Sequence, residues 1–260
     1  RADPTCHVIG GYSAMPDMFP LYQAMFDQGG LRSCDEVSLH WYPGGAPEGV
    51  AADLQRLNGM AQAQGGARPY WMTEFAYYAD DDPDPIKRNW PNLLDSEWLQ
   101  AVWNTRACVL MLAGGVEKVF YHIWTTRLNY DIGSTIFFEY AGAPHKIAVT
   151  QAAMAYLLGE KPKCVSSDLK LGEDVRGCLF EAPRHLRLPG GGDSYLAVLW
   201  SEADGCRLAR PAGGRLYDAC GRPLDGAGVA LGEAPVYVVL GGRDAGAVTQ
   251  ALSLSVSVPF

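Results

Sequence analysis

Residues 70–75 read Tyr-Trp-Met-Thr-Glu-Phe, a short apolar and aromatic run whose carboxyl end carries one acidic residue, Glu74. A run of this composition is typical of a parallel strand that is buried on both faces. Glutamate is almost never fully buried unless it is paired. At the carboxyl end of a parallel barrel strand, such a residue indicates catalysis more than structural support. Glu74 is therefore the first candidate for a functional residue.

Strand-like and helix-like segments alternate on both sides of this run. The predicted strands are residues 7–13, 36–42, 69–75 and 117–124. The predicted helices, in which apolar residues recur every three or four positions, are residues 19–28, 48–63, 96–113 and 146–158. Glycine closes each helix, as at Gly29 and Gly159. The alternation predicts an α/β fold with a parallel sheet, either doubly wound or of the barrel type.

After Gly159 the pattern changes to short strand-like pieces separated by glycine-rich turns. The pieces are residues 178–181, 195–200, 215–218 and 236–240. Helical periodicity is nearly absent, so residues 160–260 are predicted to form an antiparallel β-sandwich domain that follows an α/β domain of residues 1–159. Residues 252–258 alternate apolar residues with serine, which predicts an additional edge strand.

Composition excludes several classes of protein. With 48% hydrophobic and 19% charged residues, the chain is globular and well cored, not disordered. The net charge of −8 argues against nucleic acid or an anionic membrane as a partner, because both require a basic surface. No apolar run approaches the roughly 20 residues that cross a bilayer.

The seven cysteines lack C-x-x-C spacing. Cys164 with Cys178, or Cys206 with Cys220, could form a disulfide, but free thiols are expected.

Polar and aromatic side chains gather at the carboxyl ends of the predicted strands. Because side chains alternate along a strand, His40 and Tyr42 share one face. By the same rule, Glu74 is predicted to share a face with Met72 and Tyr70. Parallel β/α folds place their ligands at these strand ends. Each residue alone is more often a packing or rim residue, so it is their joint occurrence that indicates a site.

The last predicted strand adds Phe120, His122 and Trp124 on one face, and Arg127 and Tyr130 follow it in a loop. A carboxylate ringed by His, Tyr and Trp is typical of a sugar site. Aromatic rings stack on the C–H faces of a pyranose, while the carboxylate and imidazole groups bind hydroxyls or perform chemistry. A carbohydrate is therefore the predicted ligand.

No cofactor or metal site is predicted. The acidic stretch at residues 80–84 raises the question of calcium, but it lacks the EF-hand spacing, so a solvated loop is favoured. The glycines at 190–192 have no helix after them and predict a turn instead of a phosphate cradle.

Three segments at successive predicted strands read V-S-L-H-W-Y at 37–42, W-M-T-E-F at 71–75 and V-F-Y-H-I-W at 119–124. Together they resemble the last strands of clan A glycoside hydrolases, most closely the family 39 type that includes β-xylosidases and α-iduronidases. The segments at 216–221 and 234–237 resemble the small β-domain that follows those barrels. The resemblance implies a retaining nucleophile at Glu74 on the seventh strand. It also implies that His40 and Tyr42 support that nucleophile and bind substrate. By the same resemblance, Trp124 forms the floor of the sugar subsite.

The chain departs from this family pattern in its first half. Clan A enzymes carry their acid/base Glu after an Asn on the fourth strand, and the sequence contains no Asn-Glu pair. A complete barrel needs about 250 residues, whereas only residues 1–159 precede the predicted sandwich. Residues 7–13 match a fifth strand, so the fold predicted is half a TIM-type barrel, strands five to eight, followed by the sandwich. Such a half exposes sheet edges and an inward face. A separate chain could supply the missing half of the barrel, or the inward face of the sheet could serve as a binding groove. A second copy of the chain could also cover that face, and homo-oligomerisation is the expectation.

Retaining hydrolysis needs two carboxyls about 5–5.5 Å apart, one that attacks and one that protonates the leaving group. Glu74 is predicted to attack. Its partner is Glu139 or Asp131 within the chain, or a carboxylate of a neighbouring subunit. The predicted function is a glycoside hydrolase acting on β-linked sugars. The alternatives are a non-catalytic carbohydrate-binding protein and a subunit whose missing half-barrel is on another chain. The sequence leaves the cellular compartment open.

Overall fold

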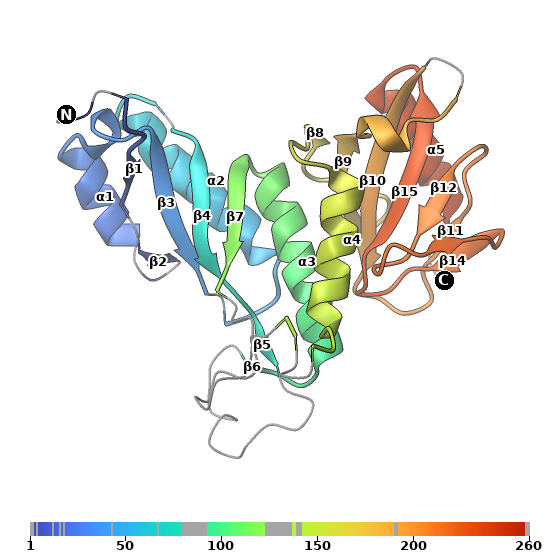
Figure 1. Ribbon diagram of the computed structural model, residues 1–260. Helices are drawn as coiled ribbons and strands as arrows, with labels where there is room; N and C mark the ends of the chain where they lie inside the picture. Colours follow the sequence, from blue (N-terminus) through green and yellow to red (C-terminus); the bar gives the residue numbers. More distant parts are fainter. Residues whose placement is uncertain are drawn as a thin grey trace. The chain divides into compact units, whose positions relative to one another are not determined.

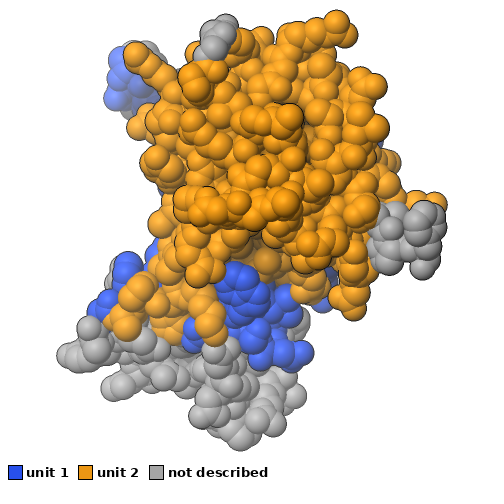
Figure 2. Space-filling model, turned by 90° about the vertical axis from the view of Figure 1, so that its right-hand side faces the viewer, with its two compact units in different colours: residues 1–100, 110–142 blue, residues 101–109, 143–260 orange. Residues whose placement is uncertain are grey.

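The structure is a computed structural model that describes residues 3, 5–11, 13–15, 17, 19–42, 44–66, 68–79, 93–122, 137–138, 142–189 and 192–257. It divides into two compact units, which Figure 2 shows in different colours. The first comprises residues 1–100 and 110–142, and the second comprises residues 101–109 and 143–260. The middle of helix α3 (Glu97–Ala113) and all of helix α4 (Lys146–Leu158) therefore belong with the β-rich part of the chain.

The first unit is built on a parallel sheet with the strand order β1-β3-β4-β7. Its strands are β1 (Ile9–Gly10), β2 (Ala14–Met15), β3 (Glu36–Trp41), β4 (Tyr70–Phe75) and β7 (Val116–Tyr121). Of the strand predicted at residues 7–13, only Ile9–Gly10 forms a strand, and the second short piece, β2, follows the predicted range. Both pieces pair in parallel with β3. The sheet thus has four strand positions. Among the described residues it is open, with β1 and β7 at its edges.

Helices cover one face of this sheet because β3 and β4 direct their apolar side chains to it. The helices of the unit are α1 (Phe19–Asp27), α2 (Gly49–Ala63) and the two ends of α3, and Figure 1 shows α2 behind the strands. Leu39 and Met72 are completely buried, and Trp41 Nε1 donates to Asp53 of α2 at 2.9 Å. These helices begin and end within one residue of the predicted bounds. A small parallel pair, β5 (Tyr78–Ala79) with β6 (Leu93–Leu94), follows β4.

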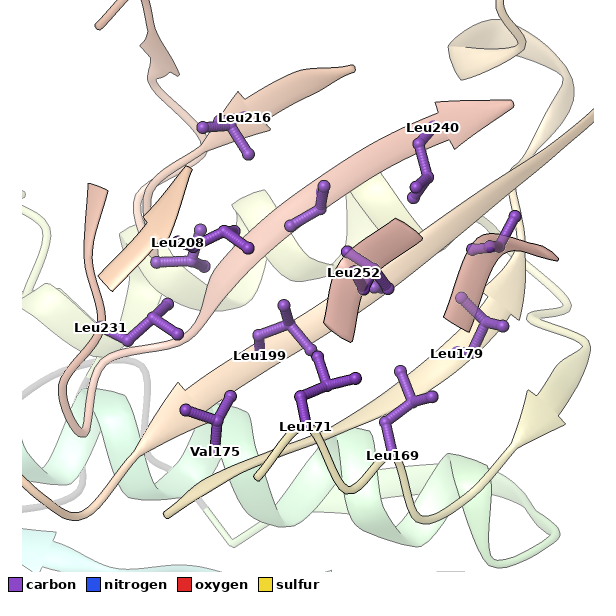
Figure 3. Packing of buried hydrophobic residues seen from close by; sticks show 14 of the residues in the cluster. Leu169, Leu171, Val175, Leu179, Leu199, Leu208, Leu216, Leu231, Leu240 and Leu252 are labelled. Carbon is purple, nitrogen blue, oxygen red and sulfur yellow. The ribbon is translucent and has the colours of Figure 1, made fainter. Parts of the chain in front are cut away.

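The second unit contains the predicted antiparallel sheets. A six-stranded sheet has the order β13-β12-β15-β10-β9-β8, and a three-stranded sheet has the order β14-β11-β16. The strands are β8 (Cys164–Ser166), β9 (Val175–Glu181), β10 (Asp193–Ser201), β11 (Arg207–Ala209), β12 (Arg215–Tyr217), β13 (Pro223–Leu224), β14 (Gly228–Ala230), β15 (Val236–Gly242) and β16 (Val256–Ser257). Figure 3 shows their shared core, whose members include Leu199, Leu208 and Leu252.

The strand predicted at the end of the chain is wrong over most of its length. Residues 252–255 belong to helix α5 (Ala245–Ser255), and only the two residues of β16 pair as a strand with β11. Asp244 caps the helix by accepting a hydrogen bond from Ala247 N at 2.8 Å. Val248 and Leu252, four residues apart on one helical face, are fully buried, whereas Leu254 is 82% exposed. Packing of this helical face favours a helix more strongly than the local alternation of apolar residues with serine favours a strand.

All seven cysteines are free thiols. Cys178 is buried in β9, where its Sγ donates to the Ser167 carbonyl at 3.4 Å and burial raises the pKa of the thiol. None of the helices in the described part of the chain has the length and apolar character of a membrane span.

The close approach of β9 and β10 at Gly177 provides a stability test. A Cβ atom at Gly177 would collide with the backbone oxygen of Val198, so Gly177→Ala should lower the free energy of unfolding by about 1–3 kcal/mol. At Gly59, inside α2, an added Cβ atom would have nothing within 4 Å. Gly59→Ala should therefore raise the free energy of unfolding by about 0.5–1 kcal/mol. Urea unfolding of both variants measures the contrast; equal effects would show that β9 and β10 are not packed this closely.

Candidate active site

The Glu74 carboxylate is held by two side chains from the end of β3. Glu74 Oε2 accepts a hydrogen bond from the Tyr42 hydroxyl at 2.7 Å and lies 3.1 Å from His40 Nδ1. The Glu74 side chain is 36% exposed and that of His40 is 19% exposed. Among the described residues, Glu74 Oε1 has no hydrogen-bond partner. One oxygen is thus fixed, and the other is left for a ligand.

A bulge in β4 turns the Glu74 side chain toward His40 and Tyr42. Leu39 pairs with Met72, and the next residue of β3, His40, pairs with Glu74, so Thr73 is one extra residue in β4. An inserted residue reverses the alternation of side chains beyond it. The prediction that Glu74 shares a face with Met72 and Tyr70 is therefore wrong. Those two residues are buried on the helical face, at 0% and 3% exposure, whereas Glu74 lies on the face of His40.

A second pair of side chains stands next to the carboxylate. The Tyr78 hydroxyl of β5 is 3.3 Å from Nδ1 of His122, the residue that follows β7. The Tyr78 ring is stacked with that of Tyr42 at 6.4 Å between centroids, and His122 meets Tyr42 edge-on at 6.2 Å. The structure thus brings together four predicted residues, Glu74, His40, Tyr42 and His122, and adds Tyr78. The sequence signal for Tyr78 is the aromatic pair that directly follows the carboxyl end of β4.

Burial shapes the protonation of the donors. It raises the pKa of the Tyr42 phenol, and the hydrogen bond to Glu74 raises that pKa further, so the phenol keeps the proton that it donates. Burial also lowers the pKa of His40, with Glu74 opposing this effect and His122 reinforcing it. His40 is therefore neutral at neutral pH. Because its neighbour is a carboxylate acceptor, we assign its single ring proton to Nδ1.

The remaining predicted site residues lie outside the described residues. They are Trp124, Arg127, Tyr130, Asp131, Glu139 and the acidic stretch 80–84. Within the described part of the chain, no second carboxylate is bonded to Glu74, and no group of three or more His, Cys, Asp or Glu side chains could hold a metal ion.

Two solved structures share this architecture. A family 39 glycoside hydrolase from the gut symbiont Bacteroides cellulosilyticus WH2 superposes with a TM-score of 0.57 at 14% sequence identity, over 84% of this chain and 46% of that one. A family 51 α-L-arabinofuranosidase from Bifidobacterium longum superposes with a TM-score of 0.50 at 11% identity, over 88% of this chain and 58% of that one. The chain spans about half the length of these two proteins.

No protein-family model matches the sequence, and no curated protein matches it. At these identities the two structures establish a likeness of fold alone. The fold is that of distant glycoside hydrolases, with an open parallel sheet where the sequence predicts half a barrel, followed by antiparallel sheets.

The lowered pKa of His40 predicts a pH-dependent stability. The unfolded chain binds this proton more readily than the folded one, so the His40 contribution to the free energy of unfolding falls as the pH drops below 6.5 and levels off beneath the lowered pKa. His40→Gln should therefore lose less stability than wild type between about pH 7 and pH 5. Thermal unfolding followed by circular dichroism measures this, with the exposed His185→Gln as control. An identical pH slope in wild type and His40→Gln would contradict the prediction.

Proposed function

We propose that this chain hydrolyses β-linked glycosides with retention of configuration and that Glu74 is the nucleophile. The observation that carries the proposal is the fixed carboxylate, whose Oε2 is held by Tyr42 and His40 while Oε1 has no partner among the described residues. The likeness of fold to two glycoside hydrolases supports the same class of reaction.

The chemistry follows from this arrangement. Glu74 Oε1 attacks the anomeric carbon as the bond to the leaving oxygen breaks, and a covalent glycosyl-enzyme forms. Tyr42 and His40 are neutral donors, so they orient the carboxylate without forming an ion pair that would quench its charge. A second carboxyl protonates the leaving oxygen and then accepts a proton from the water that releases the sugar. Glu139, Asp131 or a neighbouring subunit is proposed to supply it.

The other proposed site residues bind substrate. Tyr78 and His122 present a hydroxyl and an imidazole beside the carboxylate, a pairing suited to sugar hydroxyls. Trp124, Arg127 and Tyr130 are proposed to complete the sugar site from the segment after β7.

A non-catalytic carbohydrate-binding protein is the second candidate. It is favoured by one observation: Glu74 is the only carboxylate of the described site. Binding would then use the aromatic and imidazole groups, and Glu74 would accept hydrogen bonds from sugar hydroxyls instead of attacking carbon.

Substitution of Glu74 separates the two functions. With aryl β-glycosides, Glu74→Gln should lower kcat/KM by at least about 10³-fold, while Glu173→Gln, an exposed glutamate of the second unit, should leave it unchanged. Glu74→Ala should regain turnover in azide and yield an α-glycosyl azide, because the small anion attacks from the vacated side. Equal residual rates in wild type and Glu74→Gln would remove Glu74 as nucleophile, and glycan binding without turnover would favour the second candidate.

Tyr42 tests the support of the nucleophile. Tyr42→Phe removes one donor to a charged acceptor, an interaction of about 1.5–3 kcal/mol, so kcat should fall roughly 10- to 100-fold. KM for the same substrate should change little, because the donor acts through Glu74. Steady-state kinetics measures both values. A large rise in KM with kcat unchanged would instead place the Tyr42 hydroxyl in substrate binding.

A further inference from the structure

Tyr77 lies between two parts of the candidate site. Glu74 precedes it by three residues, and Tyr78, whose ring is stacked with that of Tyr42, follows it directly. The Tyr77 side chain takes another direction: it is 1% exposed, and its ring meets the Trp41 ring edge-on at 6.1 Å. Tyr77 is therefore buried away from any substrate, and its contacts are with residues that support the site.

Two helices hold Tyr77 in place. Its backbone carbonyl accepts a hydrogen bond from Gln100 Nε2 of α3 at 2.9 Å, and Gln100 is 2% exposed. The Trp41 ring against which Tyr77 packs is completely buried and is itself fixed by the 2.9 Å hydrogen bond to Asp53 of α2. Because closely packed side chains have little room to move, Tyr77 is a rigid point to which a neighbouring segment can be anchored.

The segment anchored in this way is the one that follows Tyr42. The Tyr77 hydroxyl donates a hydrogen bond to the Gly45 carbonyl at 2.8 Å, three residues beyond Tyr42. Gly44, Gly45 and Ala46 are exposed, and an added Cβ atom at either glycine would have nothing within 4 Å. Glycines without packing neighbours allow many backbone conformations, so a tertiary hydrogen bond here restricts the segment to one of them.

Tyr42 depends on this anchor because the sheet itself holds it weakly. β3 ends at Trp41, one residue before it. The backbone nitrogen of Tyr42 lies 3.5 Å from the Met15 carbonyl of β2, which is long for a hydrogen bond. The direction of the Tyr42 side chain, and with it the 2.7 Å hydrogen bond to Glu74 Oε2, is thus set in part by the residues that follow.

We propose that Tyr77 is a positioning residue, which keeps the Tyr42 hydroxyl on Glu74 through its hydrogen bond to Gly45. The catalytic meaning of this role rests on the proposed function, in which Tyr42 orients the nucleophile. Loss of the Tyr77 hydroxyl leaves the Gly45 carbonyl to water and gives the segment after Tyr42 other conformations. The donor to Glu74 Oε2 is then in place in a smaller fraction of the molecules, so turnover slows while the contacts to substrate remain.

A double-mutant cycle separates positioning from a general effect on folding. Tyr77→Phe keeps the ring against Trp41 and removes one hydroxyl, so kcat for aryl β-glycosides should fall about 3- to 10-fold with KM nearly unchanged. In the Tyr42→Phe background the same change should lower kcat by less than about two-fold, because its route through Tyr42 is already lost. Equal losses in both backgrounds would overturn the proposal. Tyr70→Phe removes a buried hydroxyl that has no partner within the described chain, and this matched control should leave kcat unchanged.

Carbon-13 labelling of the tyrosine Cζ atoms reports on Tyr42 by NMR without an activity assay. The Tyr42 signal is identified by its absence in Tyr42→Phe. In Tyr77→Phe it should move toward the chemical shift that it has in Glu74→Gln, where the charged acceptor is gone, and Tyr70→Phe should leave it in place. Gln100→Met, which removes the donor to the Tyr77 carbonyl, should move it in the same direction. Circular dichroism verifies the folding of each variant.

The outcomes distinguish this role from the proposed function. A moved Tyr42 signal together with the coupled loss of kcat is the expected result. An unmoved signal in the folded variants would overturn the positioning role, whatever the kinetics. A moved signal in a protein that hydrolyses no aryl β-glycoside would sustain the positioning role and reject the proposed function.

Discussion

The extra residue at Thr73 is the constraint on which the candidate site depends. Side chains of β4 up to Met72 follow the strand period, with apolar groups against the helices. One inserted residue shifts that period, so Glu74 turns away from the helices and reaches the hydroxyl of Tyr42 and the ring of His40. Without the insertion, the carboxylate would lie among completely buried side chains and would face a large desolvation penalty. The bulge therefore relieves that penalty and creates the site in the same step.

The groups around the carboxylate are neutral, and this determines what it can do. A cation at this distance would neutralise Glu74, whereas a buried phenol and a neutral imidazole orient it and leave its charge available. The stacked rings of Tyr42 and Tyr78, with His122 across them, link the ends of β3, β5 and β7. The orientation of the Glu74 carboxylate thus comes from strands far apart in the sequence that the parallel sheet holds side by side.

Within the described residues the parallel sheet is open, whereas parallel sheets are ordinarily covered on both faces. In this unit the helices cover one face, and the other face carries the carboxylate at its carboxyl end and aromatic side chains along its length. On that face Ser38 Oγ and Thr73 Oγ1 are within hydrogen-bond distance of each other, and the Lys118 ammonium group lies over the Trp71 ring. The candidate site and this face are thus one continuous feature of the sheet.

The sequence by itself determined the order of the helices and pointed to four residues of the candidate site. Helical spacing and strand alternation are local properties, so α1, α2, α3 and α4 lie within one residue of their predicted bounds. The same patterns place Glu74, His40, Tyr42 and His122 at strand ends, and the structure brings these four together. Only the tertiary structure decided the direction of Glu74, the place of Tyr78 beside His122, and the helical state of residues 252–255. These depend on inter-strand register and on packing across the core, and periodicity within a segment carries no information about either.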